Sequence, residues 1–424
     1  MTRLPLRHVL LLILVPTAGA VAQNRDTTLT AIRAGRLLDP ATGAIARNQI
    51  ILVRGTKIES VGGNLTIPEG TPVVDLSSQT VLPGLFDAHT HLCMTVKMRR
   101  DAANYFYTTL NDPDAARAVD GVINARDVLN AGFTTVRDVG NEGNYACTSV
   151  RRAIAQARIP GPTILNAGRI IAPYGGQFEL QPDKKEALAS PEYYFADTRD
   201  ELLKAVRENA HYGARVIKLV VDDQRYIYST DDIRFVIEEA RRMGLKVATH
   251  VWTKEGAHNA VVAGVASLEH ANGISDEDLA LAKKNGVVAV FTPFPEWVLR
   301  QFRDTAGAKE EYAQEIDRLR AGVRAGVTIA FGTDAIHALP GYDRGKLAIM
   351  WVDSYKAAGM TPRAILQAMT VNGARLFGVE KERGAIQPGL AADIISVPGN
   401  PADDIGALKQ VNFVMKDGRI VKRP

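Results

Sequence analysis

Short apolar runs with the character of β-strands alternate with segments of helical periodicity through the middle of this chain. This alternation is typical of a parallel sheet whose strands are joined by crossover helices. The eight runs are "TVLPGLFDAH", "GFTTVRDV", "PTILNAGRII", "ARVIKLVV", "LKVATHV", "ASLEH", "VVAVFTP" and "VTIAFGTD". Eight strand–helix units favour a closed barrel over an open doubly wound sheet. The sequence therefore predicts an α/β fold in which residues 81–382 form a (β/α)8 TIM barrel.

The two ends of the chain differ from the middle in their sequence pattern. Residues 23–80 contain short β-like runs separated by turn residues, and residues 383–424 repeat this pattern with glycine and proline between the runs. Because each end is too short to bury its own apolar face, we expect the two ends to pair in one small β-sandwich domain beside the barrel.

Residues 1–22 have the pattern of a secretory signal peptide. Arg3 and Arg7 precede an apolar stretch that begins at Val9, and small residues follow up to Ala22. An uncleaved membrane anchor is the alternative, but the apolar stretch is shorter than the roughly 20 residues that a spanning helix needs. We therefore expect an exported protein, periplasmic or secreted, with no membrane attachment after cleavage.

Charge and cysteine content narrow the functional classes further. The formal net charge is +4, and both signs are spread along the chain without a basic stripe, so nucleic acid is not an expected partner. Cys93 and Cys147 are the only cysteines, so no disulfide framework is expected to hold the fold. Cys93 follows His91 closely enough to suggest a metal ligand, but a small buried apolar residue is the favoured interpretation.

Most of the predicted strands end on a polar or ionisable side chain. The carboxyl ends of barrel strands converge on one mouth, where active sites are built. His89 and His91 lie two residues apart, so strand alternation places both imidazoles on the inner side. An isolated H-x-H pair is more often a polar cluster than a metal site. His250, His270 and Asp334 each end another apolar run, however, and these residue types bind divalent metals.

Lys218 stands inside "VIKLVV", one of the most apolar strands of the chain. A buried ammonium group is costly unless it is paired, neutralised or modified. One interpretation is a structural salt bridge with Asp222 or Asp223. The other is that neutral Lys218 reacts with carbon dioxide to give a carbamate, a carboxylate-like ligand able to bridge two cations. The residues alone leave both interpretations open.

Six pieces of the sequence carry a family resemblance: "PGLFDAHTHL", "VIKLVVDD", "ATHVW", "SLEHANG", "FGTDAIH" and "PGLAADIISV". Together they resemble the amidohydrolase superfamily, in particular its binuclear metal-dependent branch with prolidase-like, imidazolonepropionase-related and bacterial ochratoxin-degrading enzymes. The resemblance covers nearly all of the mature chain. It implies that one metal is held by His89, His91 and Asp334 and a second by His250 and His270, with N6-carboxylated Lys218 bridging both.

The resemblance also implies a reaction. A hydroxide that bridges two divalent metal ions, with zinc as the expected ion, would attack an amide carbonyl, and Asp334 would take the proton released. Lys218 and Asp334 are therefore the expected catalytic residues. The expected reaction is carboxypeptidase-like cleavage of an amide bond to a C-terminal aromatic amino acid, such as conversion of ochratoxin A to ochratoxin alpha and phenylalanine. A homo-oligomer, with an octamer as one form, is the implied assembly.

Three alternatives to this function stay open at this stage. A prolidase-like Xaa-Pro dipeptidase would use the same metal site. A mononuclear deaminase of the same superfamily would use similar histidines and an aspartate without a bridging lysine. A non-catalytic scaffold is expected to have lost ligands, whereas all six are present here.

The loops after the strands suggest how a small or dipeptide-like substrate with a free carboxylate is bound. Prolidase-like relatives tend to carry His-Gly-Gly after strand three, where this chain has Tyr174-Gly175-Gly176, so a simple Xaa-Pro specificity is in doubt. The predicted substrate contacts are Tyr174, Tyr228, His337 and Arg169.

Aromatic residues are frequent in these loops, and they suit a flat or aromatic substrate. Tyr226, Phe294 and Trp297 extend the set. The alternative is that the rings only pack the loops or an oligomer interface. Arg137, like Arg169, is either a carboxylate clamp or a buried structural partner.

Overall fold

The computed structural model describes residues 28–179, 181–184, 187 and 191–424. The predicted signal peptide, residues 1–22, lies outside the described residues. Among the helices that are described, none is long and apolar enough to cross a membrane.

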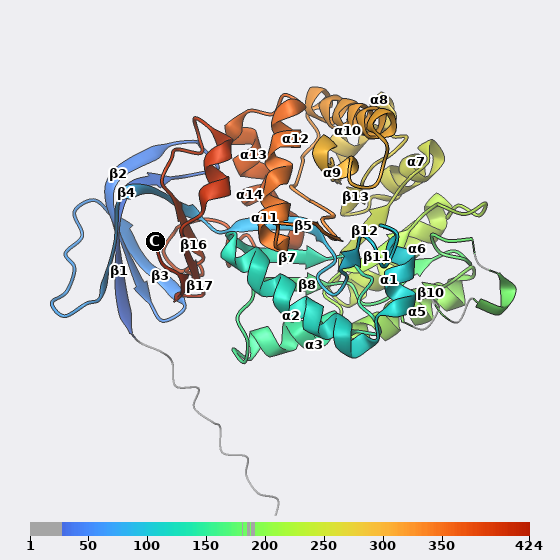
Figure 1. Ribbon diagram of the computed structural model, residues 1–424, viewed down its shortest axis with the longest axis horizontal. Helices are drawn as coiled ribbons and strands as arrows, with labels where there is room; N and C mark the ends of the chain where they lie inside the picture. The colour runs from blue at the N-terminus through green and yellow to red at the C-terminus, as the bar shows by residue number, and fades with distance from the viewer. Residues whose placement is uncertain (1–27, 180, 185–186, 188–190) are drawn as a thin grey trace, which may run out of the picture.

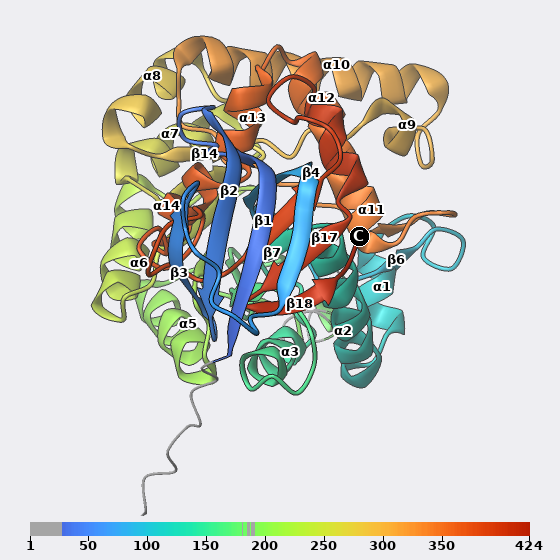
Figure 2. The same cartoon turned by 90° about the vertical axis from the view of Figure 1, so that its left-hand side faces the viewer.

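Strands from both ends of the chain form one seven-stranded sheet, which stands at the left of Figure 1 and faces the viewer in Figure 2. In sheet order the strands are β18 (Arg419–Lys422), β17 (Phe413–Lys416), β16 (Ile394–Val397), β4 (Val73–Pro83), β1 (Leu29–Leu38), β2 (Ile45–Arg54) and β3 (Lys57–Gly62). β4 joins the two ends, because it pairs in parallel with β1 and antiparallel with β16. Ile32, Val81 and Phe413 belong to one fully buried apolar cluster that these strands share. Burial of this shared cluster holds the ends of the chain together.

The first predicted barrel strand, "TVLPGLFDAH", is two strands in the structure. Residues up to Pro83 belong to β4, so the predicted domain boundary after residue 80 falls inside a strand of the terminal sheet. β5 (Leu85–Thr90) begins after Gly84. A Cβ at Gly84 would lie 2.2 Å from the Thr134 hydroxyl oxygen, so only glycine lets the neighbouring strand pass this close.

Parallel strands occupy the middle of the chain in two main sheets. One has the order β5, β7 (Phe133–Asp138) and β8 (Thr163–Asn166). The other has the order β10 (Tyr193–Phe195), β9 (Ile170–Ala172), β11 (Ile217–Val220), β12 (Val247–His250), β13 (Ser267–Glu269) and β14 (Val288–Val290). A separate short pair joins β6 (Val96–Lys97) to β15 (His337–Ala338). These strands are fully buried where they carry the site, as their near-continuous apolar sequences predict.

The segment after residue 328 connects the two parallel sheets. Ala330 N donates to Ala289 O at 3.1 Å, and Ala88 N donates to Phe331 O at 2.7 Å. Asp334 N then donates to His89 O at 2.9 Å. This segment is the predicted run "VTIAFGTD", but only an isolated bridge between Ala289 and Ile329 has regular strand pairing. Its end is therefore fixed beside β5 by hydrogen bonds of irregular backbone.

Helices follow most of the parallel strands and surround them (Figure 1, Figure 2). They are α1 (Tyr105–Asn111), α2 (Asp114–Asn130), α3 (Ala146–Ala155), α5 (Arg199–Tyr212), α6 (Thr230–Arg242), α7 (Lys254–Ala263), α8 (Asp276–Asn285), α9 (Glu296–Leu299), α10 (Thr305–Ala325), α11 (Arg344–Ala348), α12 (Val352–Ala357), α13 (Pro362–Ala368) and α14 (Val371–Phe377). Reciprocal side-chain caps define the starts of α5, at Thr198 and Glu201, and of α6, at Ser229 and Asp232. These caps fix the points at which the loops after β10 and β11 end and the next helices begin.

Candidate active site

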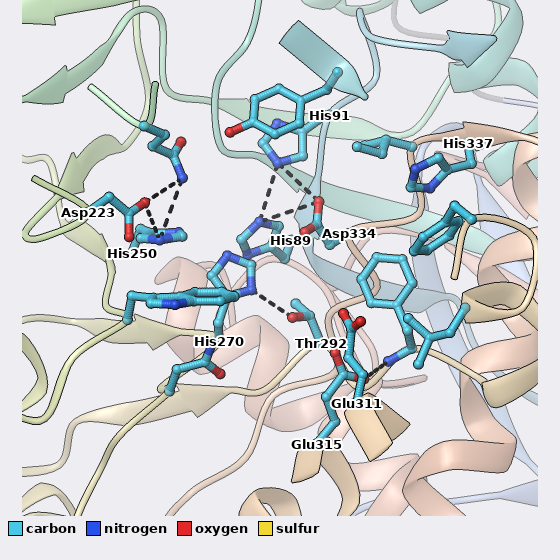
Figure 3. Close-up of a pocket in the computed structure, with 18 of the residues that line it drawn as sticks. His89, His91, Asp223, His250, His270, Thr292, Glu311, Glu315, Asp334 and His337 are labelled. Carbon is cyan, nitrogen blue, oxygen red and sulfur yellow. Dashed lines mark hydrogen bonds and ion pairs between the residues drawn. The ribbon is translucent and has the colours of Figure 1, made fainter. Parts of the chain in front are cut away.

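His89 and His91 place two imidazole nitrogens next to one carboxylate. Their Nε2 atoms lie 3.3 Å apart, and the Oδ1 atom of Asp334 lies 3.3 Å from His91 Nε2 and 3.9 Å from His89 Nε2 (Figure 3). Strand alternation from β5 brings the two imidazoles to the same side, and the hydrogen bond from Asp334 N to His89 O brings the aspartate beside them. Three potential ligand atoms thus lie within 4.8 Å of one another.

The outer nitrogen of each imidazole already has a partner. His89 Nδ1 lies 2.8 Å from a carboxylate oxygen of Glu269, and His91 Nδ1 lies 2.9 Å from the carbonyl oxygen of Gly140. Because a carbonyl and an ionised carboxylate only accept, we assign the hydrogen of each neutral ring to Nδ1. Both Nε2 lone pairs then face each other and the carboxylate of Asp334. This arrangement is repulsive by itself and fits a bound cation.

His270 and His250 continue the same row of imidazoles. The ring of His270 lies 4.7 Å from that of His89 and 4.7 Å from that of His250, measured between ring centroids. Thr292 orients His270, because its hydroxyl oxygen lies 2.8 Å from Nδ1. Asp223 approaches His250 Nε2 to 3.0 Å, and Trp252 stacks on the His250 ring. Side chains on or just after five strands, β5, β11, β12, β13 and β14, therefore form one continuous cluster (Figure 3).

Left-handed backbone at the strand ends aims several of these side chains. The φ angles are 63° at His270, 54° at Asp334, 48° at Thr292 and 102° at Asp223. Non-glycine residues adopt this region at a cost, and such strain is concentrated at functional sites. Here it turns the chain sharply after the strand while the side chain still faces the mouth.

Lys218 is buried at the base of the cluster. Only 2% of its surface is exposed, and β11 pairs with β12 in a register that sets Lys218 opposite Ala248 and Val220 opposite His250. Burial lowers the pKa of Lys218 to about 8. Within the described residues the ammonium group has neither a hydrogen bond nor an ion pair.

The predicted salt-bridge alternative for Lys218 is not formed with either aspartate. Both carboxylate oxygens of Asp222 accept hydrogen bonds at the start of α7, from Trp252 N at 2.8 Å and from Thr253 N and its hydroxyl at 2.7 Å each. Asp223 pairs with His250 instead. Asp222, Asp223 and His250 form a second group of potential metal ligands. In this group the carboxylate of Asp222 already accepts hydrogen bonds from backbone amides.

Burial and nearby charge set the protonation of the site. Burial, together with the charge of Lys218, lowers the pKa of His89 to about 4, and burial with the neighbouring imidazoles lowers that of His270 well below its usual value. Burial alone would raise the pKa of Asp334, but its interactions with His91, His89 and Lys218 bring it down to about 2. At neutral pH the site therefore offers neutral His89 and His270 rings and an ionised Asp334 carboxylate.

A cavity of about 670 Å³ contains all six predicted ligands. His89, His91, Lys218, His250, His270 and Asp334 line it, and so does the predicted substrate contact His337. The His337 ring stacks on Phe302 with centroids 4.7 Å apart, and its buried Nδ1 has no hydrogen-bond partner in the described part of the chain. The walls also carry Tyr105, Trp252 and Phe294.

Three predicted substrate contacts lie outside this cavity. Tyr228 is 1% exposed, belongs to the main apolar core, and donates its hydroxyl to Ala196 O at 2.6 Å. Tyr174 is half exposed and packs against Phe195. Arg169 pairs with Glu208 on α5 at 3.0 Å and reaches Asn144. The structure places these three residues outside the cavity, with their side chains directed to Ala196 O, the Phe195 ring and Glu208.

Other sequence candidates have structural partners. Arg137 is a buried support and not a clamp, since it donates to Ala88 O at 2.7 Å and to Glu269 at 2.6 Å. Cys93 is fully buried in the core, as favoured from the sequence. Trp297 packs against Tyr342 with ring centroids 5.0 Å apart.

Sequence reasoning missed the most deeply buried member of the site, Glu269. It is 0% exposed, accepts a hydrogen bond from His89 and pairs with Arg137. The Arg137 charge and the His89 hydrogen bond overcome its burial and lower its pKa to about 2. The sequence feature that could have identified Glu269 is its charge within the short run "SLEH", directly before His270. Asp223, Gln177 and Arg318 also line the cavity without having been singled out as site residues.

Parallel strands with surrounding helices, and a histidine–carboxylate cavity at their carboxyl ends, define a TIM-barrel-type α/β protein with a candidate hydrolytic site. The model of the Amidohydrolase family matches residues 80–421. The chain belongs to this family and is a hydrolase that acts on carbon–nitrogen bonds.

Individual relatives cover nearly the whole chain. Ochratoxinase from Aspergillus niger is 28% identical over 95% of this chain and 89% of its own length. Imidazolonepropionase from Alkaliphilus metalliredigens is 26% identical over 88% of this chain and 89% of its own length. Among solved structures, a Xaa-Pro dipeptidase with bound methionine in the active site has a TM-score of 0.81 at 29% identity, covering 93% of this chain and 100% of its own.

Proposed function

We propose that the protein is a binuclear, metal-dependent amidohydrolase that cleaves an amide bond to a C-terminal, aromatic amino acid. The observation that carries this proposal is the pair of facing Nε2 lone pairs on His89 and His91 beside the Asp334 carboxylate, continued by His270 and His250. The substrate is a small molecule with a free carboxylate, and an N-acyl phenylalanine such as ochratoxin A is the model compound.

The donor set suits two divalent cations, with zinc as the expected ion. His89, His91 and Asp334 would hold one ion, and His250 and His270 the other. When bound, the ions lower the pKa of a coordinated water and polarise the scissile carbonyl. Asp223 contacts His250 Nε2 and would have to share or release it, whereas Asp222 is held by backbone amides at the start of α7.

Lys218 fits the role of a carboxylated bridging ligand. Its buried amine has a pKa of about 8, against 10.5 as the ordinary value, so roughly one-tenth of it is neutral at neutral pH. The Nζ lone pair would form a bond to the carbon of carbon dioxide, and the nitrogen would release a proton to give a carbamate. That group replaces an unpaired buried cation by an anion that two cations can hold.

Asp334 is placed to move protons during the reaction. Its carboxylate is ionised at neutral pH and faces the cavity beside His91. It would accept the proton of the attacking water and pass it to the departing amine, a role that general acid–base groups fill at this geometry.

The substrate class is argued from the walls of the cavity. Trp252, Phe294, Phe302 and Tyr105 provide apolar and aromatic surface for an aromatic side chain. The similarity to ochratoxinase favours the same class. A Xaa-Pro dipeptidase is the second candidate, because the solved dipeptidase matches this chain over almost its full length.

The same proposal includes the organisation of the mature protein. The chain from β5 to residue 382 would form the complete (β/α)8 barrel, and residues 23–80 with 383–424, together with the end of β4, would form a β-sandwich domain. Residues 1–22 would direct export and be removed. The mature chain would assemble as a homo-oligomer, for which light scattering of the purified protein is the direct measurement.

One screen tests the proposed reaction. Zinc-loaded protein and its Asp334→Asn variant are incubated with dipeptides, N-acyl aromatic amino acids and ochratoxin A, and the released amino acid is quantified. We expect hydrolysis of N-acyl phenylalanines, reduced about 10²- to 10⁴-fold by Asp334→Asn. Preferred hydrolysis of Xaa-Pro dipeptides would select the second candidate, and no hydrolysis of any compound would refute both.

A further inference from the structure

One wall of the cavity is formed by residues between Phe294 and Arg318, which come from α9, α10 and the loops around them. A chain of contacts ties this wall to the imidazole row. Thr292 contacts His270 at 2.8 Å, and two residues later Phe294 N donates to Glu315 at 2.6 Å. Arg318 follows Glu315 by three residues on α10, so both side chains leave the same face of the helix. Figure 3 shows Thr292 and Glu315 on the His270 side of the cavity.

Arg318 is a cation without a partner in this wall. Its Nε atom is completely buried and makes no hydrogen bond, and the structure gives its guanidinium group no ion pair within the described ranges. A guanidinium group stays charged and has five N–H donors, so leaving it desolvated and unpaired is costly. An arginine that lines a cavity in this state has donors to offer to a ligand.

The other charged groups of the wall do not compensate Arg318. Arg303 and Glu311 neutralise each other in an ion pair of 2.8 Å. Glu315 accepts from Phe294 N, and burial raises its pKa to about 8, so it is mostly uncharged at neutral pH. Glu310 is exposed and accepts a hydrogen bond from Gln314. The buried part of this wall is therefore positive at Arg318.

We propose that Arg318 binds the α-carboxylate of the substrate and so selects C-terminal amino acids with a free acid group. This inference rests on the proposed function and names its specificity-determining residue. A planar guanidinium group matches a carboxylate through two parallel hydrogen bonds, which a neutral carboxamide cannot reproduce. Arg318 thereby takes the role that the sequence suggested for Arg169, which is occupied by Glu208.

The test compares N-acetyl-L-phenylalanine with N-acetyl-L-phenylalaninamide as substrates of zinc-loaded protein. We expect Arg318→Met to lower kcat/KM for the acid about 10- to 100-fold and to leave release of phenylalaninamide from the amide unchanged. Arg318→Lys should retain part of the preference for the acid, since it keeps the charge but loses the planar fork. Arg320→Met is the matched control, because Arg320 lies on the same helix and pairs with Asp317 away from the cavity.

The outcomes separate this inference from the proposed function. An equal loss on acid and amide in Arg318→Met would show that Arg318 supports the wall and does not recognise the carboxylate. If the wild-type protein hydrolyses neither compound, the proposed function fails, and calorimetric binding of N-acetyl-L-phenylalanine decides the role of Arg318. Binding to Arg318→Met that is at least about 10-fold weaker than binding to wild type supports recognition of the carboxylate by Arg318. Equal binding, or no binding to wild type, overturns it.

Discussion

The Nε2 atoms of His89 and His91 lie 3.3 Å apart, and each ring is held from behind by a separate hydrogen-bond acceptor. Two lone pairs at this distance repel each other unless a proton or a cation lies between them. The acceptors, Glu269 and Gly140 O, place the ring hydrogens on the outer nitrogens. The fold thus holds the inner nitrogens ready for a metal ion, at the cost of burying Glu269 and Arg137 behind them.

Removal of Lys218 is expected to cost one of two bound metal ions. The Lys218→Ala variant should bind about one ion per chain where wild type binds about two, because the second ion loses its shared ligand. Elemental analysis after dialysis measures the stoichiometry, and hydrolysis should fall with it. Lys204→Ala, at an exposed position of α5, is the control. Two ions and normal turnover in Lys218→Ala would contradict the bridging role.

Substitution of Glu269 is expected to weaken metal binding without removing a ligand. Glu269→Gln should reduce zinc affinity about 10- to 100-fold, because the orientation of His89 is lost. It should also lower the free energy of unfolding by up to about 3–5 kcal/mol, since buried Arg137 loses its counter-ion. Competition with a chelator and urea unfolding are the two measurements. Glu296→Gln breaks the exposed pair with Arg300 and should cost no more than about 1 kcal/mol.

Glu315 should make stability depend on pH above the acidic range. Its pKa is raised to about 8 in the folded protein, against 4.5 as the ordinary value. Between these values the folded state binds the extra proton, so stability decreases as pH rises and levels off above about 8. The difference in Tm between Glu315→Gln and wild type should therefore be larger at about pH 8.5 than at about pH 5, two values on either side of the titration. A constant difference between the two pH values would show that Glu315 does not titrate in this way. Glu310→Gln, at an exposed position five residues earlier on α10, is the control.

Tyr228 is expected to contribute to stability and not to substrate binding. Tyr228→Phe removes the buried hydrogen bond to Ala196 O and leaves a carbonyl unpaired, at a cost of about 1–3 kcal/mol. Because the ring lies outside the cavity, KM and kcat should stay at wild-type values. Thermal unfolding and steady-state kinetics with one substrate test both statements. A higher KM with unchanged stability would return Tyr228 to the substrate site.

Strand periodicity made the central cluster accessible to prediction. His89 and His91 reach one side because alternation along a strand has a period of two. His250, His270 and Asp334 end apolar runs whose carboxyl ends share a mouth, and Lys218 stands inside another such run. The first predicted strand was divided differently, because Gly84 ends β4 and starts β5 at a close approach to Thr134. No period in the sequence marks such a change of sheet.

The loop residues were less predictable for a physical reason. Of the four predicted substrate contacts, His337 lines the cavity, whereas Tyr174, Tyr228 and Arg169 do not. A loop has no repeating geometry, so the direction of its side chains depends on the neighbouring helices that compete for them. Glu208 draws Arg169 toward α5, and Ala196 O draws the Tyr228 hydroxyl away from the mouth.

The sequence by itself determined the alternation of strands and helices and the residue types at the strand ends, because both follow from local periodicity and strand direction. Only the tertiary structure decided which distant groups support them. Glu269 meets His89 across 180 positions of sequence, and Arg318 reaches the cavity wall from a helix whose placement depends on long-range packing. Hydrogen bonds and ion pairs of this kind depend on distances of a few tenths of an ångström, which no local pattern encodes.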